Sequence, residues 1–101
     1  MRVLALVGLT LFLLAQPAVS QVPDDKVIVP GVVGHATDIV EHPEVIAERL
    51  LRYARIVGRE NVMAGTDCGL GPRVGSAQVC WAKFEAMAEG ARLASKELWG
   101  R

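Results

Sequence analysis

Few side chains of this sequence are of a type that does chemistry, and Cys68 is the best placed of them. It stands beside Asp67 in the segment TDCGLG at 66–71, between a short apolar run and a loop rich in glycine. In parallel α/β folds, ligands bind beyond the carboxyl ends of the strands. The thiolate is the reactive and metal-binding form of cysteine. The position therefore predicts that Cys68 faces a ligand, with a passive thiol as the alternative.

Two further polar residues follow the other apolar run of the sequence. His35 and Asp38 come just after residues 26–34, so we expect them at the same end of the fold as Cys68. A metal-ligating or acid/base role is open to His35, and a solvated loop histidine is the alternative. We interpret Asp38 as a loop or cap carboxylate on that same face.

Cys80 differs from Cys68 because it falls on the apolar stripe of a predicted helix. A buried free cysteine behaves as a small hydrophobic side chain, and the stripe favours this interpretation. A Cys68–Cys80 disulfide is the alternative, and it requires an oxidising compartment.

Composition and charge exclude several classes of protein. Eleven Lys and Arg balance eleven Asp and Glu, so the formal net charge is zero, without the basic face of a nucleic-acid binder. Hydrophobic residues make up 51% of the sequence, which argues against disorder. Two cysteines are too few for a disulfide scaffold or a four-cysteine zinc site. The 101 residues are thus expected to form at most one small domain that binds no nucleic acid.

Two short strands are predicted from apolar runs bounded by glycine. Residues 26–34 (KVIVPGVVG) are a β-branched run, typical of a strand buried on both faces of a parallel sheet. Pro30 has no N–H to donate, so we expect it to mark the end of this strand. Residues 61–66 (NVMAGT) are the second candidate strand.

A first amphipathic helix is predicted over residues 43–57. Pro43 suits the first helical position, His42 precedes it at the helix start, and Gly58 is a plausible stop. The arginines of this region are expected on a solvated face. They are Arg49, Arg52, Arg55 and Arg59.

A second helix is predicted over about residues 77–98, with Ser76 as its N-cap. Apolar residues recur in it at helical spacing, which predicts a stripe that faces the core. The expected stripe comprises Cys80, Phe84, Met87, Ala88, Ala91, Ala94 and Leu98.

The order strand, helix, strand, helix implies parallel strands with helical crossovers. Two strands do not complete such a fold, because a parallel sheet needs cover on both faces and its open edges favour aggregation. We therefore expect residues 21–101 to be part of a larger sheet or barrel, whose other strands are absent or come from another chain.

The first 20 residues differ from the rest of the chain. Arg2 precedes an uncharged apolar run at 3–14, and residues 18–20 (AVS) place small side chains at both ends of a tripeptide. This is the pattern of a secretory signal, and it is too short for a membrane span of about 20 apolar residues. We predict a signal-like apolar helix at 1–20, with the apolar start of a truncated or fused gene as the alternative.

Five segments, taken in order, resemble one known family. They are 29–33 (VPGVV), 40–44 (VEHPE), 57–62 (VGRENV), 64–69 (AGTDCG) and 88–94 (AEGARLA). Together they resemble the C-terminal part of the cobalamin-independent methionine synthase superfamily. They are most similar to its short single-domain branch, which includes epoxyalkane:coenzyme M transferase-like proteins.

The resemblance implies a (β/α)8 TIM barrel, of which this chain would form the last two βα units. It also implies a catalytic zinc that binds a substrate thiol such as homocysteine, which then accepts an alkyl group from a methyl donor. Zinc would stabilise the substrate thiol as a thiolate, which is a good nucleophile at neutral pH. Cys68 matches the family's last zinc ligand, and Asp67, His35 and Asp38 are candidate neighbours of the substrate. His35 does not lie in the family's His-x-Cys ligand motif.

The expected function follows from this resemblance and from the length of the chain. A TIM barrel takes about 250 residues, and a catalytic zinc usually has three protein ligands. We therefore expect a C-terminal fragment of a 5-methyltetrahydropteroyltriglutamate–homocysteine S-methyltransferase, the zinc-dependent type that makes methionine. It would be cytoplasmic and inactive unless another chain supplies the rest of the barrel. The alternative is a small exported binding or structural protein, secreted or periplasmic, with a Cys68–Cys80 disulfide.

Overall fold

A computed structural model of the chain describes residues 22–100. Its elements in chain order are β1 (Gly31–Val33), α3 (Pro43–Val57), β2 (Gly65–Thr66) and α4 (Ala77–Trp99). The predicted α/β order of strand, helix, strand and helix is confirmed, whereas the leader predicted at 1–20 lies outside the described residues. Within those residues no helix is both long enough and apolar enough to span a bilayer.

The two strands pair in parallel, as their order in the sequence predicts. Gly31 lies opposite Gly65, and an isolated bridge between Ile28 and Val62 extends the pairing toward the start of both strands. Ile28 donates its N–H to the Asn61 carbonyl at 2.9 Å and accepts from the Met63 N–H at 2.9 Å. The structure thus holds a two-stranded parallel sheet, and a complete barrel remains a prediction.

Pro30 does not end the first strand, and that prediction is wrong. The bridge at Ile28 precedes it and β1 starts directly after it at Gly31. Because proline has no N–H for the ladder, it interrupts the pairing without terminating it. The expected burial also holds for only part of the run, since Val32 and Val33 are buried while Val29 is 59% exposed.

Helix α3 has the ends that its sequence predicts. The His42 Nδ1 atom accepts the Glu44 N–H at 3.1 Å, and Pro43 occupies the first turn. Gly58 ends the helix with a φ of 96°, a conformation that favours glycine, and its N–H donates to the Ala54 carbonyl at 2.9 Å. The buried face consists of Ile46, Ala47, Leu50, Leu51 and Ala54.

Helix α4 has Ser76 as its N-cap, as predicted, and its predicted apolar stripe is confirmed in part, because Ala94 is buried and Met87, Ala91 and Leu98 pack against the core. The Ser76 Oγ atom accepts the Val79 N–H at 3.2 Å. The buried residues are Lys83, Ala86, Gly90 and Ala94. Phe84, expected in the core, is 40% exposed, and Ala88 is also exposed.

Small residues explain why this face of α4 meets α3. A Cβ atom on Gly90 would lie 2.6 Å from the Cβ atom of Ile46, closer than real carbon atoms approach. The helices therefore touch where α4 has no side chain, and larger residues such as Phe84 are displaced from the contact.

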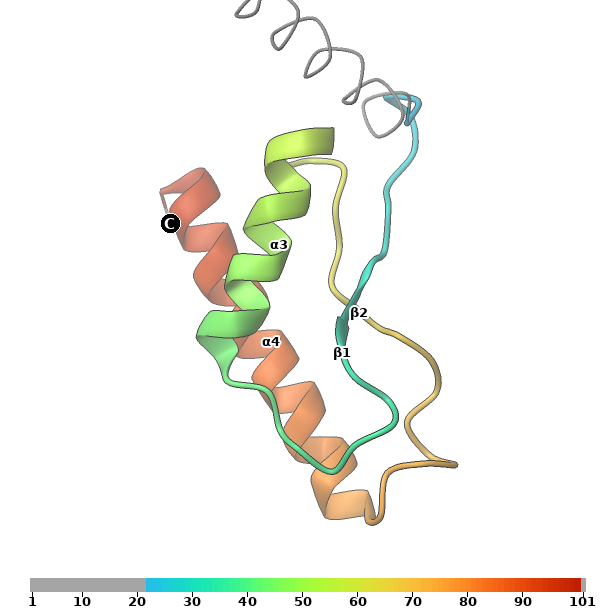
Figure 1. Cartoon of the computed structure of the whole chain (residues 1–101). Helices are drawn as coiled ribbons and strands as arrows, with labels where there is room; N and C mark the ends of the chain where they lie inside the picture. Colours follow the sequence, from blue (N-terminus) through green and yellow to red (C-terminus); the bar gives the residue numbers. More distant parts are fainter. Residues whose placement is uncertain (1–21, 101) are drawn as a thin grey trace, which may run out of the picture.

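Both helices lie on the same side of the two strands and run in the same direction (Figure 1). Val32 and Val33 of β1 pack with the buried faces of α3 and α4 in one hydrophobic cluster. The loop after β1 and the loop after β2 emerge at the same end of the molecule, at the bottom of Figure 1. This end is where the predicted site residues lie.

Candidate functional site

The two loops at the carboxyl ends of the strands are tied together. The Asp38 Oδ1 atom, in the loop after β1, accepts the N–H of Gly75 in the loop after β2 at 2.6 Å. Asp38 was predicted as a loop carboxylate or a neighbour of the substrate. In the structure it holds the second loop against the first, as a loop carboxylate does.

A buried ion pair fixes the same loop to α4. Lys83 is fully buried, and its Nζ atom donates to the Ile39 carbonyl at 2.5 Å and to the Glu41 Oε1 atom at 2.9 Å. The other carboxylate oxygen, Oε2, accepts the Gly34 N–H at 2.5 Å. An ammonium group is retained in a protein interior only when it is paired and hydrogen-bonded. The network therefore connects α4 to both ends of the loop after β1.

The pKa of Glu41 is lowered from its ordinary value of 4.5. Partial burial raises the pKa of this carboxyl, but hydrogen bonds from the Gly34 N–H and the Lys83 ammonium lower it by more. Glu41 is therefore a carboxylate at neutral pH, with both oxygens already engaged. It is placed to hold the loop and not to exchange protons with a ligand.

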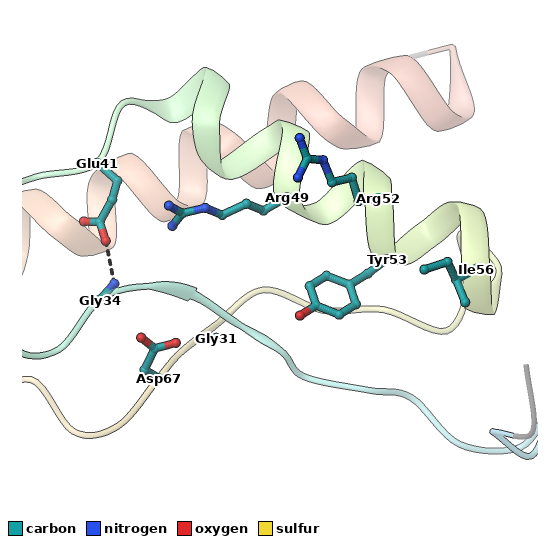
Figure 2. A pocket seen from close by; sticks show the side chains of 8 residues that line it. All are labelled: Gly31, Gly34, Glu41, Arg49, Arg52, Tyr53, Ile56 and Asp67. Atoms are coloured by element: carbon teal, nitrogen blue, oxygen red, sulfur yellow. Dashed lines mark hydrogen bonds between the residues drawn. The ribbon is translucent and has the colours of Figure 1, made fainter. Parts of the chain in front are cut away.

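An open cavity of about 580 Å³ lies between β1 and α3 (Figure 2). Its lining combines two arginines, two carboxylates and a phenol with apolar surface of similar extent. The lining residues are Gly31, Gly34, Glu41, Arg49, Arg52, Tyr53, Ile56 and Asp67. Figure 2 shows the side chains of Arg49 and Tyr53 reaching from α3 toward β1.

Asp67 is the one predicted site residue that lines this cavity. Its carboxylate lies so close to Gly31 that a Cβ atom at position 31 would overlap it. Glycine in β1 thus makes room for the Asp67 side chain, which comes from the residue directly after β2. The carboxylate is exposed and available to a ligand.

Two of the arginines expected to be only solvated hold neighbouring elements. Arg49 donates to the Val32 carbonyl of β1 at 2.9 Å. Arg59 donates to the Leu98 carbonyl at 2.6 Å, and its guanidinium lies 3.9 Å from the ring centroid of Trp99. Guanidinium groups bind carbonyls and stack on aromatic faces, so Arg49 joins α3 to β1 and Arg59 joins the loop after α3 to the end of α4.

Cys68 is exposed in the loop after β2 and does not line the cavity. His35 is half-buried, and its Nδ1 atom is buried without a hydrogen-bond partner in the described chain. Among residues 22–100 there is no group of three His, Cys, Asp or Glu side chains that could hold a metal ion. Residues 1–21 contain none of these four types. The predicted site residues therefore share one end of the fold without converging.

The two cysteines are both free. Cys80 is half-buried on α4 and lines a second cavity, of about 540 Å³, with Leu70 and Val74. Cys68 is exposed in the preceding loop. The alternative prediction of a Cys68–Cys80 disulfide is not met in this structure, and Cys80 fits the interpretation as a small hydrophobic residue.

This arrangement offers binding groups without an assembled catalytic centre. The cavity presents the Tyr53 phenol and the Asp67 carboxylate to a ligand, whereas Arg49 is held by the Val32 carbonyl and Arg52 pairs with Glu48 at 2.5 Å. Nucleophilic catalysis needs a base within hydrogen-bond reach of the nucleophile. In the described part of the chain, no hydrogen bond joins the Cys68 thiol to such a base.

Sequence reasoning missed the Lys83–Glu41 network and the cavity arginines. A signal for Lys83 was present, because it is in register with Ala86, Gly90 and Ala94 on one helical face. Small residues repeated at that spacing indicate a close helix contact, so a lysine on the same face must find a buried partner.

The similarity searches place this geometry among known folds. No family model and no curated protein matches the sequence. Among solved structures, a B12-independent methionine synthase from Shewanella sp. W3-18-1, solved in complex with selenomethionine, superposes with a TM-score of 0.74 and 28% sequence identity. The match covers 85% of this chain and 24% of that enzyme.

This match shows that the chain shares the fold of one part of a methionine synthase. The chain spans about a quarter of the length of the enzyme that it resembles. The similarity supports the resemblance to the cobalamin-independent methionine synthase superfamily that the sequence motifs indicate.

Proposed function

We propose that this chain carries one ligand of a zinc-dependent thiol methyltransferase site of the methionine synthase type, and that the ligand is Cys68. The supporting observation is its place in the exposed loop after β2. This loop belongs to a fold that superposes on a methionine synthase with a TM-score of 0.74. The carboxyl end of a parallel strand is where α/β folds bind their ligands.

The described residues do not fit a complete zinc site. A catalytic zinc takes three protein ligands, and residues 22–100 hold no group of three candidate side chains. The remaining ligands of the proposed site must therefore come from outside these residues. The chain is expected to transfer no methyl group alone, so no reaction step through zinc is derived from its residues.

The substrate class follows from the resemblance of the sequence to the superfamily. A thiol such as homocysteine would be the acceptor, and 5-methyltetrahydropteroyltriglutamate would be the methyl donor. The short single-domain branch, which includes epoxyalkane:coenzyme M transferase-like proteins, remains the proposed position within the superfamily. Asp67 is the carboxylate best placed to contact such a substrate, since it is exposed and follows β2 directly.

Cobalt titration tests the assignment of Cys68. Cobalt(II) replaces zinc in many sites, and its bond to a thiolate produces a charge-transfer absorption. We expect the full-length chain to show this band only at high metal concentration, because a single thiolate binds weakly. The band should disappear in Cys68→Ser and persist in the matched variant Cys80→Ser.

Two results would contradict the proposal. An unchanged band in Cys68→Ser would show that this thiol is not the ligand. Methylation of homocysteine by the purified chain, with one equivalent of bound zinc, would show that the site is complete without outside ligands.

A further inference from the structure

One face of the two-stranded sheet is bare among residues 22–100. Both helices lie on the other side of the strands, as Figure 1 shows. Val62 packs against the hydrophobic cluster beside the helices, and its bridge partner Ile28 shares that face. Because side chains alternate along a strand, Val27, Val29 and Met63 point to the opposite face. We call this opposite face the outer face.

The outer face is apolar at one end and charged at the other. It consists of Val27, Val29 and Gly31 on one strand and Met63, Gly65 and Asp67 on the other. The three large apolar side chains lie toward the amino ends of the strands, and they are 48%, 59% and 60% exposed. Asp67 lies at the carboxyl end of the sheet with its carboxylate exposed. Proteins cover both faces of a parallel sheet, so this face calls for an apolar layer.

The first residues of the chain have the chemistry that this face calls for. Residues 3–14 are an uncharged apolar run. A helix of twelve residues is about 18 Å long, and the strand from Met63 to Asp67 spans about 13 Å. Residues 15–26 connect the run to the first strand and can reach over about 40 Å. The run is therefore long enough to cover the outer face, and its connection is long enough to let it fold back.

Charge favours one direction for the run and this occupant over a second copy. The connection enters at the amino ends of the strands, so a run that is antiparallel to them brings Arg2 to the carboxyl end, beside Asp67. Arg2 is the charged side chain of the first 20 residues. A two-fold contact between copies pairs a surface with itself, and it would set Asp67 against a second carboxylate or against apolar side chains.

We propose that residues 3–14 pack as a helix across the outer face, with Arg2 paired to Asp67. The run then covers the two valines and Met63 as a helical layer covers a parallel sheet. A substrate that contacts Asp67 has to displace Arg2, so this contact also restricts access to the proposed site. The packing itself does not depend on the assignment of Cys68 as a zinc ligand.

Oxidation of Met63 measures whether the outer face is covered. Hydrogen peroxide converts accessible methionine to its sulfoxide, and peptide mass spectrometry follows each methionine of the full-length chain separately. Leu9→Asp places a charge inside the run, so Met63 should be oxidised about tenfold faster than in the wild-type chain. Gln16→Asp adds the same charge outside the run and should leave the rate unchanged. Met87 packs against the core and should keep its rate in every variant.

An exchange of charges tests the pairing of Arg2 with Asp67. Arg2→Glu should raise the oxidation rate of Met63 about twofold to fivefold, the range expected for an exposed ion pair. Adding Asp67→Arg to this variant restores opposite charges and should return the rate to that of the wild-type chain. Asp67 is exposed, so its replacement leaves the hydrophobic core intact.

Three results would overturn the proposal. Equal oxidation rates of Met63 in the wild-type chain and in Leu9→Asp would show that the run does not cover the face. Protection that falls on dilution, together with the mass of a dimer, would assign the face to a second copy. Loss of the first 20 residues during export from the producing cell, read from the intact mass, would assign the run to a signal. Cobalt titration at Cys68 tests the proposed function separately.

Discussion

Replacing Lys83 by methionine tests whether the buried ion pair holds the fold together. The substitution keeps a side chain about as long as the aliphatic stem of lysine and removes the ammonium group. It leaves the Ile39 carbonyl without its 2.5 Å donor and the Glu41 carboxylate without its 2.9 Å partner. The Glu41 side chain is only 13% exposed, so water replaces little of the lost interaction.

The size of the effect follows from this geometry. Removing one partner of a buried ion pair destabilises a protein by about 3–5 kcal/mol. The Gly34 N–H still donates to Glu41, so we expect the lower end, about 3 kcal/mol. Small domains unfold with urea slopes of about 1–3 kcal/mol/M, so the unfolding midpoint should fall by at least about 1 M.

Urea unfolding of the full-length chain, followed by far-UV circular dichroism, measures this change. Lys96→Met makes the same substitution at an exposed position of the same helix, where surface changes stay within about 0.5 kcal/mol. The double variant Lys83→Met with Glu41→Gln removes the unpaired charge and should recover about 1–3 kcal/mol. Equal midpoints for Lys83→Met and Lys96→Met would refute the role given to the ion pair.

The lowered pKa of Glu41 predicts a pH dependence with a definite sign. The folded state favours the carboxylate, so this stabilisation is complete above the ordinary value of 4.5 and is lost as the pH falls through the lower folded value. The wild-type chain should lose more stability than Glu41→Gln as the pH drops below 4.5. Parallel acid-unfolding curves for the two proteins would contradict this expectation.

Three further substitutions or reactions have expected outcomes. Gly90→Ala places a Cβ atom 2.6 Å from that of Ile46 and should lower the free energy of unfolding by about 1–3 kcal/mol, measured in urea. Ser76→Ala removes the hydrogen bond to the first turn of α4 and should destabilise by about 1 kcal/mol in the same assay. Iodoacetamide without reductant should modify Cys68 faster than Cys80, measured by intact mass, whereas a protein that resists modification would indicate a disulfide.

Local signals in the sequence predicted the ends of the helices. The helix ends depend on the N-caps His42 and Ser76, on Pro43 in the first turn of α3 and on the C-cap Gly58. Each of these residues acts on backbone only a few positions away, so its role is encoded locally. The order of the elements follows from the same signals. The strands are shorter than the apolar runs suggested, because Pro30 interrupts the pairing and leaves Val29 exposed at the open edge.

The core face of α4 was not predictable from hydrophobicity alone. Gly90 and Ala86 are buried because they allow α3 to approach, while the larger Phe84 packs edge-on against Trp81 at the surface, with ring centroids 6.0 Å apart. Which face a helix buries therefore depends on the helix that packs against it. Lys83 can be buried because its ammonium group donates to the Glu41 carboxylate and to the Ile39 carbonyl.

The carboxylates at the carboxyl end of the sheet divide into two groups, and this division narrows the candidate site. Asp38 and Glu41 each accept a backbone N–H across a loop, so their charge is used to hold the two loops in place. Asp67 and Cys68 are exposed and lie on the loop that Asp38 helps to fix. A ligand that reaches this end would therefore meet a thiol and one carboxylate on a positioned loop. On the proposal that Cys68 is a zinc ligand, its partner ligands are expected beyond residues 22–100, since those residues hold no group of three candidate side chains.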